Sequence, residues 1–306
     1  MRTASSCRRA DEASVLSEEL QAPITCPDVS PDPVDLCVNC YERTYRDVLR
    51  PGFFATLADD HMRGFARRTA IVNNVHDRAD VEARARRLKD AGELDAWFFV
   101  EDHIDGALER TGLTRSDLGR APYFTDWGLV LASVPGPDWM VHCDPEVRMR
   151  ERCDWVTPAI ELMERDRRVM VANPRWHAPT PRHDTLARET LESTGEFALG
   201  LGFSDQLFLA RRSELAAPIY RQRCVATRRY PMANVSPSFE ARVDAWMRHH
   251  DRLRAIFLAA TYAHPDTIGG GYPARRPREK LGSLVNRVVI ASVQRSPVKS
   301  HCCRAL

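Results

Sequence analysis

The stretch of sequence that decides the fold is Asp138-Trp139-Met140-Val141-His142-Cys143-Asp144-Pro145-Glu146-Val147. Its apolar run from Trp139 to Val141 predicts a buried strand. The run ends in possible metal or nucleotide ligands, which are His142, Asp144 and Glu146. A carboxylate at the carboxyl end of a strand in an α/β sheet lies where such sheets bind their ligands. Asp144 can therefore hold a divalent cation that holds a diphosphate. The alternative is a strand followed by a turn with solvated acids.

Segments of strand and helix alternate on both sides of this stretch. The expected strands are 34–42, 68–77, 95–102, 139–141, 168–174 and 207–212, and the expected helices are 45–67 (interrupted by Pro51-Gly52), 80–91 (capped by Asp80), 104–111, 126–136, 157–165, 213–220 and 239–262. This repeated order is typical of a parallel sheet with helices on its faces. The helix over 239–262 has the most regular apolar face.

Composition and charge place the chain among soluble globular proteins. Of its 306 residues, 43% are hydrophobic and 28% are charged, which allows a sizeable core. The net charge is +2 and the arginines are interleaved with acids, so we expect no nucleic-acid partner. No apolar run reaches the roughly 18 residues that span a bilayer, and residues 1–33 lack the apolar core of a signal peptide. We therefore expect a cytoplasmic protein without a transmembrane segment.

The nine cysteines are scattered, and in a reducing compartment we expect them to be small buried residues. Cys37-x-x-Cys40 has the spacing of a zinc or redox site. No second pair follows at ligand spacing, which favours core cysteines. For the domain organisation, we expect a flexible leader over 1–33, one domain over 34–268 and a basic, partly disordered tail over 269–306.

The order of these segments between Val34 and Pro265 resembles the nucleotide-sugar-dependent glycosyltransferases of the GT-A fold, such as those of family 2. The resemblance implies an α/β fold with a Rossmann-type, mixed but mainly parallel sheet flanked by helices. It also implies a nucleotide-sugar donor and an acceptor hydroxyl, which a glycan, a lipid-linked sugar or a small metabolite can supply. The residues that the resemblance assigns to donor binding are Asn39, Tyr41, Arg43, Asn73, Asn74, Asp77, Asp126 and His142. Tyr41 can stack on the nucleobase or pack in the core.

The metal-binding motif of this family is Asp-x-Asp, and His142-Cys143-Asp144 occupies its place. The last acid of the motif contacts the metal most directly, so the resemblance assigns Asp144 as a ligand of Mn²⁺ or Mg²⁺. Several GT-A families supply a late histidine as the final ligand, and His264 matches it. The first acid is replaced by His142, although histidine is itself a ligand for manganese. The alternative for His264 is an ordinary histidine at a helix end.

A second matching place is Gly202-Phe203-Ser204-Asp205-Gln206, where inverting GT-A enzymes carry a general base. Asp205 is accordingly the expected catalytic residue, since a positioned carboxylate can take the proton of an acceptor hydroxyl. In other members an Asp-Gln step at this place binds the sugar, and Asp205 can also simply cap a turn. Asn73 and Asn74 can likewise be turn residues.

Two other functions compete with sugar transfer. A nucleotidyltransferase needs a glycine-rich loop after its first strand, and residues 39–44 contain no glycine. A non-catalytic protein that binds nucleotide or carbohydrate on the same fold remains open, because His142 replaces an acid of the motif.

Overall fold

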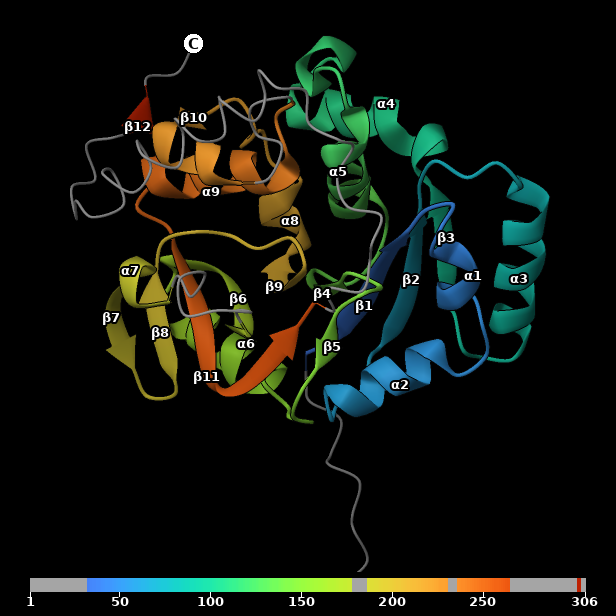
Figure 1. Cartoon of the computed structure of the whole chain (residues 1–306), viewed down its shortest axis with the longest axis horizontal. Helices are drawn as coiled ribbons and strands as arrows, with labels where there is room; N and C mark the ends of the chain where they lie inside the picture. The colour runs from blue at the N-terminus through green and yellow to red at the C-terminus, as the bar shows by residue number, and fades with distance from the viewer. Residues whose placement is uncertain (1–31, 178–185, 231–235, 265–301, 304–306) are drawn as a thin grey trace, which may run out of the picture.

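The computed structural model describes residues 32–177, 186–230, 236–264 and 302–303 (Figure 1). The predicted leader, apart from residues 32–33, lies outside the described residues. So does the predicted tail, apart from two cysteines that form a short strand. The domain boundaries predicted from the sequence therefore stay predictions. Among the described helices, none combines the length and the apolar character needed to cross a bilayer.

Strands and helices alternate along most of the chain. The strands are β1 (Val34–Cys40), β2 (Arg67–Val72), β3 (Ala96–Phe99), β4 (Trp139–Cys143), β5 (Arg148–Met149), β6 (Val169–Trp176), β7 (Thr190–Thr194), β8 (Phe197–Gly200), β9 (Leu207–Arg211), β10 (Arg223–Cys224), β11 (Leu253–Ala263) and β12 (Cys302–Cys303). The α-helices are α1 (Tyr45–Val48), α2 (Phe53–Asp60), α3 (Arg78–Asp90), α4 (Val100–Thr111), α5 (Asp126–Ser133), α6 (Val156–Arg165), α7 (Leu186–Glu189), α8 (Arg212–Leu215) and α9 (Phe239–His249). Short 3₁₀ turns are η1 (Arg115–Leu118), η2 (Pro122–Phe124) and η3 (Val225–Arg229).

One ten-stranded sheet forms the centre of the molecule, in the order β3-β2-β1-β4-β9-β6-β11-β8-β7, with β5 paired to β11. The strands β3, β2, β1 and β4 run parallel to one another, and β6 runs parallel to β11. The strand β9 runs antiparallel between β4 and β6, and β8 runs antiparallel to β11. Parallel neighbours need crossover connections, which the helices supply. The predicted α/β class with a mixed, mainly parallel sheet is confirmed.

The two faces of the sheet carry separate hydrophobic cores. Alternate residues of a strand point to opposite faces, so Leu36 and Val38 of β1 belong to one core and Cys37 to the other. The first core is completed by α1, α2, α3 and α6, and the second by α4, α5, α8 and α9 (Figure 1). Cys37 and Cys40 are both buried and unlinked, as the favoured interpretation of that pair predicted.

The prediction of a helix over residues 239–262 is wrong for the second half of that range. The helix α9 begins at the Ser238 cap, whose side chain accepts from the main-chain N–H of Ala241, and ends at His249. Asp251 then takes a left-handed conformation with φ 53°, which a helix does not tolerate. The chain continues as β11, so the apolar residues from Leu253 onward belong to a central strand. The apolar residues of this segment recur every three or four positions, as in a helix, because several residues of β11 are buried on both faces of the sheet.

Two smaller predictions are also corrected. The α3 helix is capped by Asp77, whose carboxylate accepts from the main-chain N–H of Asp80, so Asp80 is not the cap. The strand expected over 95–102 ends at Phe99, and Glu101 and Asp102 lie in the first turn of α4. Negative side chains are favourable there because the helix N-terminus carries partial positive charge.

Candidate functional site

The sheet topology brings the loop before β9 against the end of β4. The strand β1 runs beside β4 with Val38 opposite Cys143, so both carboxyl ends lie at one edge. Because β9 is antiparallel, its first residue, Leu207, also lies opposite Cys143. The main-chain N–H of Asp144 donates to the carbonyl of Gln206 at 2.7 Å, which fastens the two segments together. Gln206 therefore lies next to Asp144 and Asp205 lies within electrostatic reach of it, as a shared site requires.

Asp144, Glu146 and His264 form a group that can hold a metal ion. One ligand atom from each lies within 4.8 Å of the others, and all three side chains are partly buried. The His264 Nε2 is 3.6 Å from a carboxylate oxygen of Glu146. Pairing of Ala263 with Arg148, between β11 and β5, brings His264 to this place. Two carboxylates and an imidazole suit manganese, and the carboxylates also suit magnesium.

The electrostatics of this group favour a cation. Burial raises the pKa of Asp144, while His264 and Arg148 oppose the shift. Burial also raises the pKa of Glu146, and the negative charge of Asp144 adds to the effect. The charged form of each carboxyl group is therefore less stable in this site than it is in water. A bound cation would relieve that cost.

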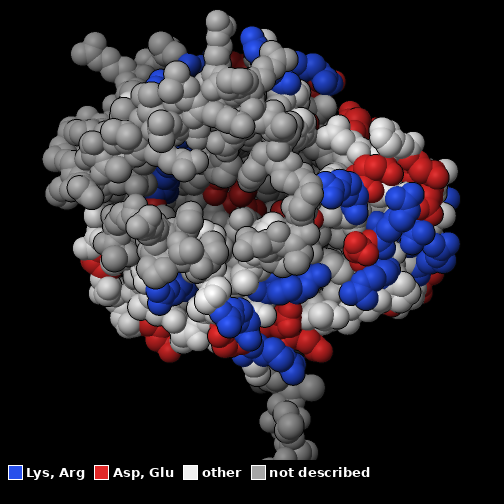
Figure 2. Space-filling model, in the orientation of Figure 1, with Lys and Arg blue, Asp and Glu red and all other residues white. Residues whose placement is uncertain are grey.

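Asp205 lies within electrostatic reach of Asp144 and of a second carboxyl, that of Glu240. Burial raises the pKa of Asp205 to about 7, and the charge of Asp144 contributes. Glu240, in the first turn of α9, has its pKa raised by burial and then by Asp205, while an interaction with the Asp205 main chain opposes the shift. Figure 2 shows acidic side chains in a hollow near the middle of the face in view. Sequence reasoning missed Glu240, although the Ser238 cap two residues earlier marks a helix start at which an acid can be held.

His142 takes no part in the group of possible metal ligands. Its side chain is fully buried, stacked on Trp127 with ring centroids 4.6 Å apart and packed against Phe208 at 5.1 Å. Burial lowers the pKa of His142 to about 3, which keeps the ring neutral, and the Asp205 main chain opposes the shift. The imidazole Nε2 lies 3.0 Å from the side-chain oxygen of Asn39. The place of the first acid in the motif is thus part of the core, and His142 reaches the edge of the site through Asn39.

Asn73 and Asp126 meet at the carboxyl end of β2. The side-chain amide of Asn73 donates to the Asp126 carboxylate at 2.8 Å, and the same carboxylate oxygen accepts from the Trp127 main-chain N–H at 2.7 Å. The main-chain N–H of Asn73 donates to the carbonyl of Cys40, at the end of β1. Burial raises the pKa of Asp126, and Trp127 and Asn73 oppose the shift. The structure thus brings together two of the residues expected to bind donor.

Asn74 and Asp77 have local structural roles. Asn74 is an exposed turn residue with φ 48°, and its main-chain N–H donates to Glu101 at 3.3 Å. Asp77 is the cap of α3 described above. Their part in donor binding stays a prediction. Both roles are the ordinary ones that asparagine and aspartate have at turns and helix starts.

Tyr41 and Arg43, just after β1, lie near the possible metal ligands. Burial raises the pKa of the Tyr41 hydroxyl, the charge of Glu146 adds to the effect, and Arg43 opposes it. Arg43 also opposes the rise in the pKa of Glu146. Both residues therefore lie within electrostatic reach of the group.

Comparison with known proteins gives similar solved structures but no related sequence. No family model and no curated protein matches the chain. GalNAc-T7 with UDP, GalNAc and Mn²⁺ is similar at 10% identity over 85% of this chain and 48% of that chain, with a TM-score of 0.47. The mannosyltransferase PcManGT from Pyrobaculum calidifontis, in complex with GDP-Man and Mn²⁺, is similar at 12% identity over 87% and 73%, with a TM-score of 0.45.

Glucosyl-3-phosphoglycerate synthase from Mycobacterium tuberculosis, with Mn²⁺, UDP and glucosyl-3-phosphoglycerate, is similar at 13% identity over 86% of this chain and 79% of that chain, with a TM-score of 0.40. This chain thus spans about half the length of the first of the three and most of the other two. The similarity concerns the arrangement of strands and helices alone.

Proposed function

We propose that the chain transfers a sugar from a nucleotide-sugar donor to the hydroxyl group of an acceptor. The observation that carries this proposal is a group of possible metal ligands, Asp144, Glu146 and His264, near a pair of partly buried carboxyls, Asp205 and Glu240. Such a pairing suits a reaction in which a charged diphosphate leaves and a hydroxyl loses its proton.

The donor nucleotide would bind across the ends of β1 and β2. The Asn73–Asp126 pair offers an amide with one hydrogen-bond partner and a buried carboxylate with two, which fixes their orientation. Asn39 is held by the neutral His142 ring. Tyr41 lies within electrostatic reach of Glu146 and is available for contact with the nucleoside. Side chains held in place in this way lose little conformational freedom on binding.

Asp144, Glu146 and His264 would hold a divalent cation, Mn²⁺ or Mg²⁺. When bound, such an ion neutralises the charge that develops on a departing diphosphate. The protein itself contributes two partly buried carboxylates whose charge is unfavourable without a cation. Arg43 lies close enough to oppose the shift at Glu146 and can contact an anionic phosphate.

Asp205 would act as the general base. The acceptor hydroxyl passes its proton to the Asp205 carboxylate, its oxygen bonds to the anomeric carbon, and the bond from that carbon to the diphosphate breaks. Attack from the face opposite the leaving group inverts the anomeric carbon. A pKa of about 7 suits this role, because a base works best when its pKa is near the working pH. Glu240 is the alternative base, since it lies within electrostatic reach of Asp205 and its pKa is also raised.

The test is the thermal stability of the protein with UDP, GDP, CDP or dTDP, each with and without Mn²⁺. A ligand that binds only the native state stabilises it by about 2.7 kcal/mol at 100 times its dissociation constant. We expect a metal-dependent rise in the unfolding midpoint with one nucleotide. Asp144→Asn should abolish that rise. Asp105→Asn is the matched control, because Asp105 is an exposed carboxylate paired with Arg115 on the surface.

Sugar transfer is then measured with the nucleotide sugars of the base that binds, and the anomeric configuration of the product is read by NMR. An inverted product supports the base mechanism. A rise with nucleotide but no transfer to any acceptor or to water would favour a binding protein. An unfolding midpoint that no nucleotide raises would contradict the proposal.

A further inference from the structure

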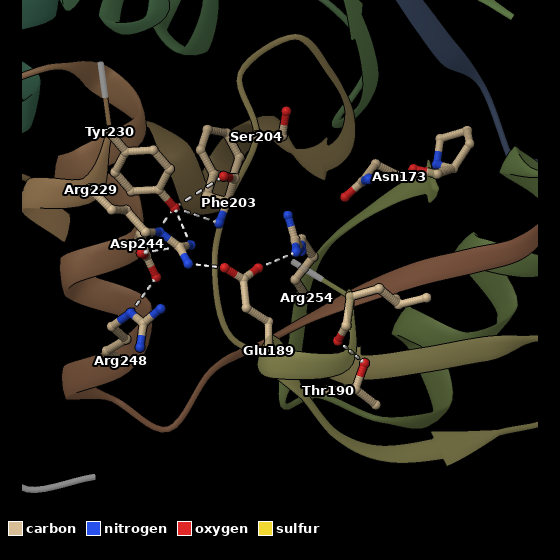
Figure 3. Close-up of polar contacts among 12 residues, drawn as sticks. Asn173, Glu189, Thr190, Phe203, Ser204, Arg229, Tyr230, Asp244, Arg248 and Arg254 are labelled. Atoms are coloured by element: carbon tan, nitrogen blue, oxygen red, sulfur yellow. Dashed lines mark hydrogen bonds and ion pairs between the residues drawn. The ribbon is translucent and has the colours of Figure 1, made fainter. Parts of the chain in front are cut away.

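A buried network of charged side chains lies directly behind the Asp205 loop. We call it the ion-pair network, and Figure 3 shows it between α7, α9 and β11. Its members are Glu189, Arg229, Tyr230, Asp244, Arg248 and Arg254. It lies outside the group of possible metal ligands, and the proposed reaction makes no use of it. Buried ion pairs do little for stability compared with apolar packing, so a network of this size calls for another explanation.

The carboxylates of the network each have more than one cationic or hydroxyl partner. Glu189 accepts hydrogen bonds from Arg229 and, at 2.7 Å, from Arg254. Asp244 accepts from Arg248 at 2.8 Å. Burial would raise the pKa of Asp244, but the neighbouring arginines outweigh it and hold the pKa below its usual value. The network is thus charged, and its geometry is fixed by paired bonds.

Tyr230 connects this network to the main chain of the Asp205 loop. Its hydroxyl donates to the Asp244 carboxylate at 2.9 Å and accepts from Arg229 at 2.9 Å. It also accepts from the main-chain N–H of Phe203 at 3.0 Å. Phe203 lies two residues before Asp205. The position of the hydroxyl, and with it the main chain at Phe203, is therefore set by Asp244 and Arg229.

The loop fits the network closely on either side of Phe203. Gly202 has φ 106°, and a Cβ there would lie 2.6 Å from an Arg229 nitrogen and 2.9 Å from a Glu189 oxygen. Only glycine combines that conformation with that approach. On the other side, the Ser204 hydroxyl lies 3.0 Å from the hydroxyl of Tyr262, two residues before His264. Residues 202–204 are thus held on both sides immediately before Asp205.

We propose that Tyr230 is a positioning residue for the Asp205 carboxyl, a role that rests on the proposed function of the site. Asp244 and Arg229 orient its hydroxyl, the hydroxyl fixes Phe203, and Phe203 sets where Asp205 stands relative to Asp144. Without the hydroxyl, the buried N–H of Phe203 loses its partner and the loop relaxes. A displacement of about 1 Å in a reacting group can lower the rate by about 100-fold.

The test compares Tyr230→Phe with Tyr45→Phe. Tyr45 is the matched control because it is also buried and its hydroxyl also donates to a carboxylate, that of Asp80, at 3.0 Å. Both variants keep the ring and lose one hydroxyl–carboxylate bond. Amide hydrogen exchange of the peptide 200–208 reports the order of the loop. Kinetics with saturating donor report kcat separately from KM.

In Tyr230→Phe we expect faster exchange over 200–208, a fall in kcat of about 10- to 100-fold and an unchanged KM for donor. In Tyr45→Phe we expect wild-type values for all three. Unchanged exchange over 200–208 in Tyr230→Phe overturns the proposal, and so does faster exchange with unchanged kcat. A wild-type protein without transfer activity overturns the proposed function instead, and the exchange data still show whether Tyr230 holds the loop.

Discussion

Two groups of acids, one partly buried and one fully buried, lie on either side of residues 202–204 and differ in how their charge is balanced. In the first, burial raises the pKa values of Asp144, Glu146, Asp205 and Glu240, and a neighbouring acid adds to the effect at the last three. In the second, Asp244 has a lowered pKa because two arginines outweigh its burial. The same residue types thus have opposite properties within one short region.

The difference distinguishes acids that are suited to bind a ligand from acids that hold the protein's own structure together. The first group has more negative charge than its surroundings neutralise, so it gains by binding a cation or a proton. The second group has its charges paired inside the protein and gains nothing from a ligand. Mutation of an acid in the first group should therefore affect activity directly. Mutation of an acid in the second should lower folding stability, and it reaches activity only through the position of Tyr230.

The largest effect is expected from Asp205→Asn, which keeps the shape of the side chain but removes the base. Transfer should fall by about 10²–10⁴-fold, with nucleotide binding retained. Glu240→Gln is the matched comparison, because it removes the neighbouring carboxyl. If Glu240→Gln alone abolishes transfer and Asp205→Asn does not, the roles of the two residues are exchanged.

A large effect on stability is expected from Asp244→Asn. Removing the charge leaves Arg248 without the carboxylate that it pairs with and leaves Arg229 with Glu189 alone, and breaking a buried pair costs about 3–5 kcal/mol. Urea unfolding of the variant and the wild type measures the difference. Asp102→Asn is the control, since its pair with Arg78 lies on the surface. Equal stability of Asp244→Asn and the wild type would erase the contrast between the two groups.

A smaller effect is expected from Glu146→Gln, which removes one possible metal ligand at the edge of the first group. Affinity for Mn²⁺ should fall by about 10- to 100-fold, the range seen when even outer partners of a metal site are removed. Calorimetric titration with Mn²⁺ measures it. The folded protein should be no less stable, because the variant relieves repulsion between Glu146 and Asp144. Unchanged affinity would take Glu146 out of the group.

The smallest effect is a change of stability with pH. Burial raises the pKa of Asp205 from 3.8 to about 7, so the native state holds a proton that the unfolded state releases between these values. Stability contributed by this proton is therefore lost as the pH rises from about 4 to about 7. Asp205→Asn should remove that loss, so its thermal unfolding midpoint should exceed that of the wild type at pH 8 but not at pH 4. Each kcal/mol of added stability raises the midpoint by about 2–4 °C. Equal curves for both proteins would contradict the assigned pKa.

Much of the fold followed from local sequence. The strands β1, β2, β4 and β9 and the helices between them were expected, because runs of apolar residues and turn residues mark them directly. Placing Asp205 beside Asp144 also followed, through the resemblance to a known fold. The strand β11 was missed because residues buried on both faces of a sheet have no alternating pattern, and their spacing matched a helix instead.

The ion-pair network could not be read from the sequence. Glu189 bonds to Arg229 and Arg254, which are 40 and 65 residues away. Pairing over such separations depends on the strand order, and each member resembles an ordinary surface charge in a sequence rich in arginine. Glu240 was missed for the same reason. Its role depends on α9 starting directly beside the Asp205 loop, a contact between distant segments.

The place of β11 in the sheet has a consequence for biosynthesis. Among the strands of the ten-stranded sheet, β11 is the last along the chain, yet it lies between β6 and β8 and ends one residue before His264. A chain leaves the ribosome N-terminus first, at about 5–20 residues per second. The half of the sheet around β1 and β4 can thus form while β6 and β8 still await the strand that joins them. A ligand that needs His264 can therefore bind only after β11 has been made and has completed the sheet.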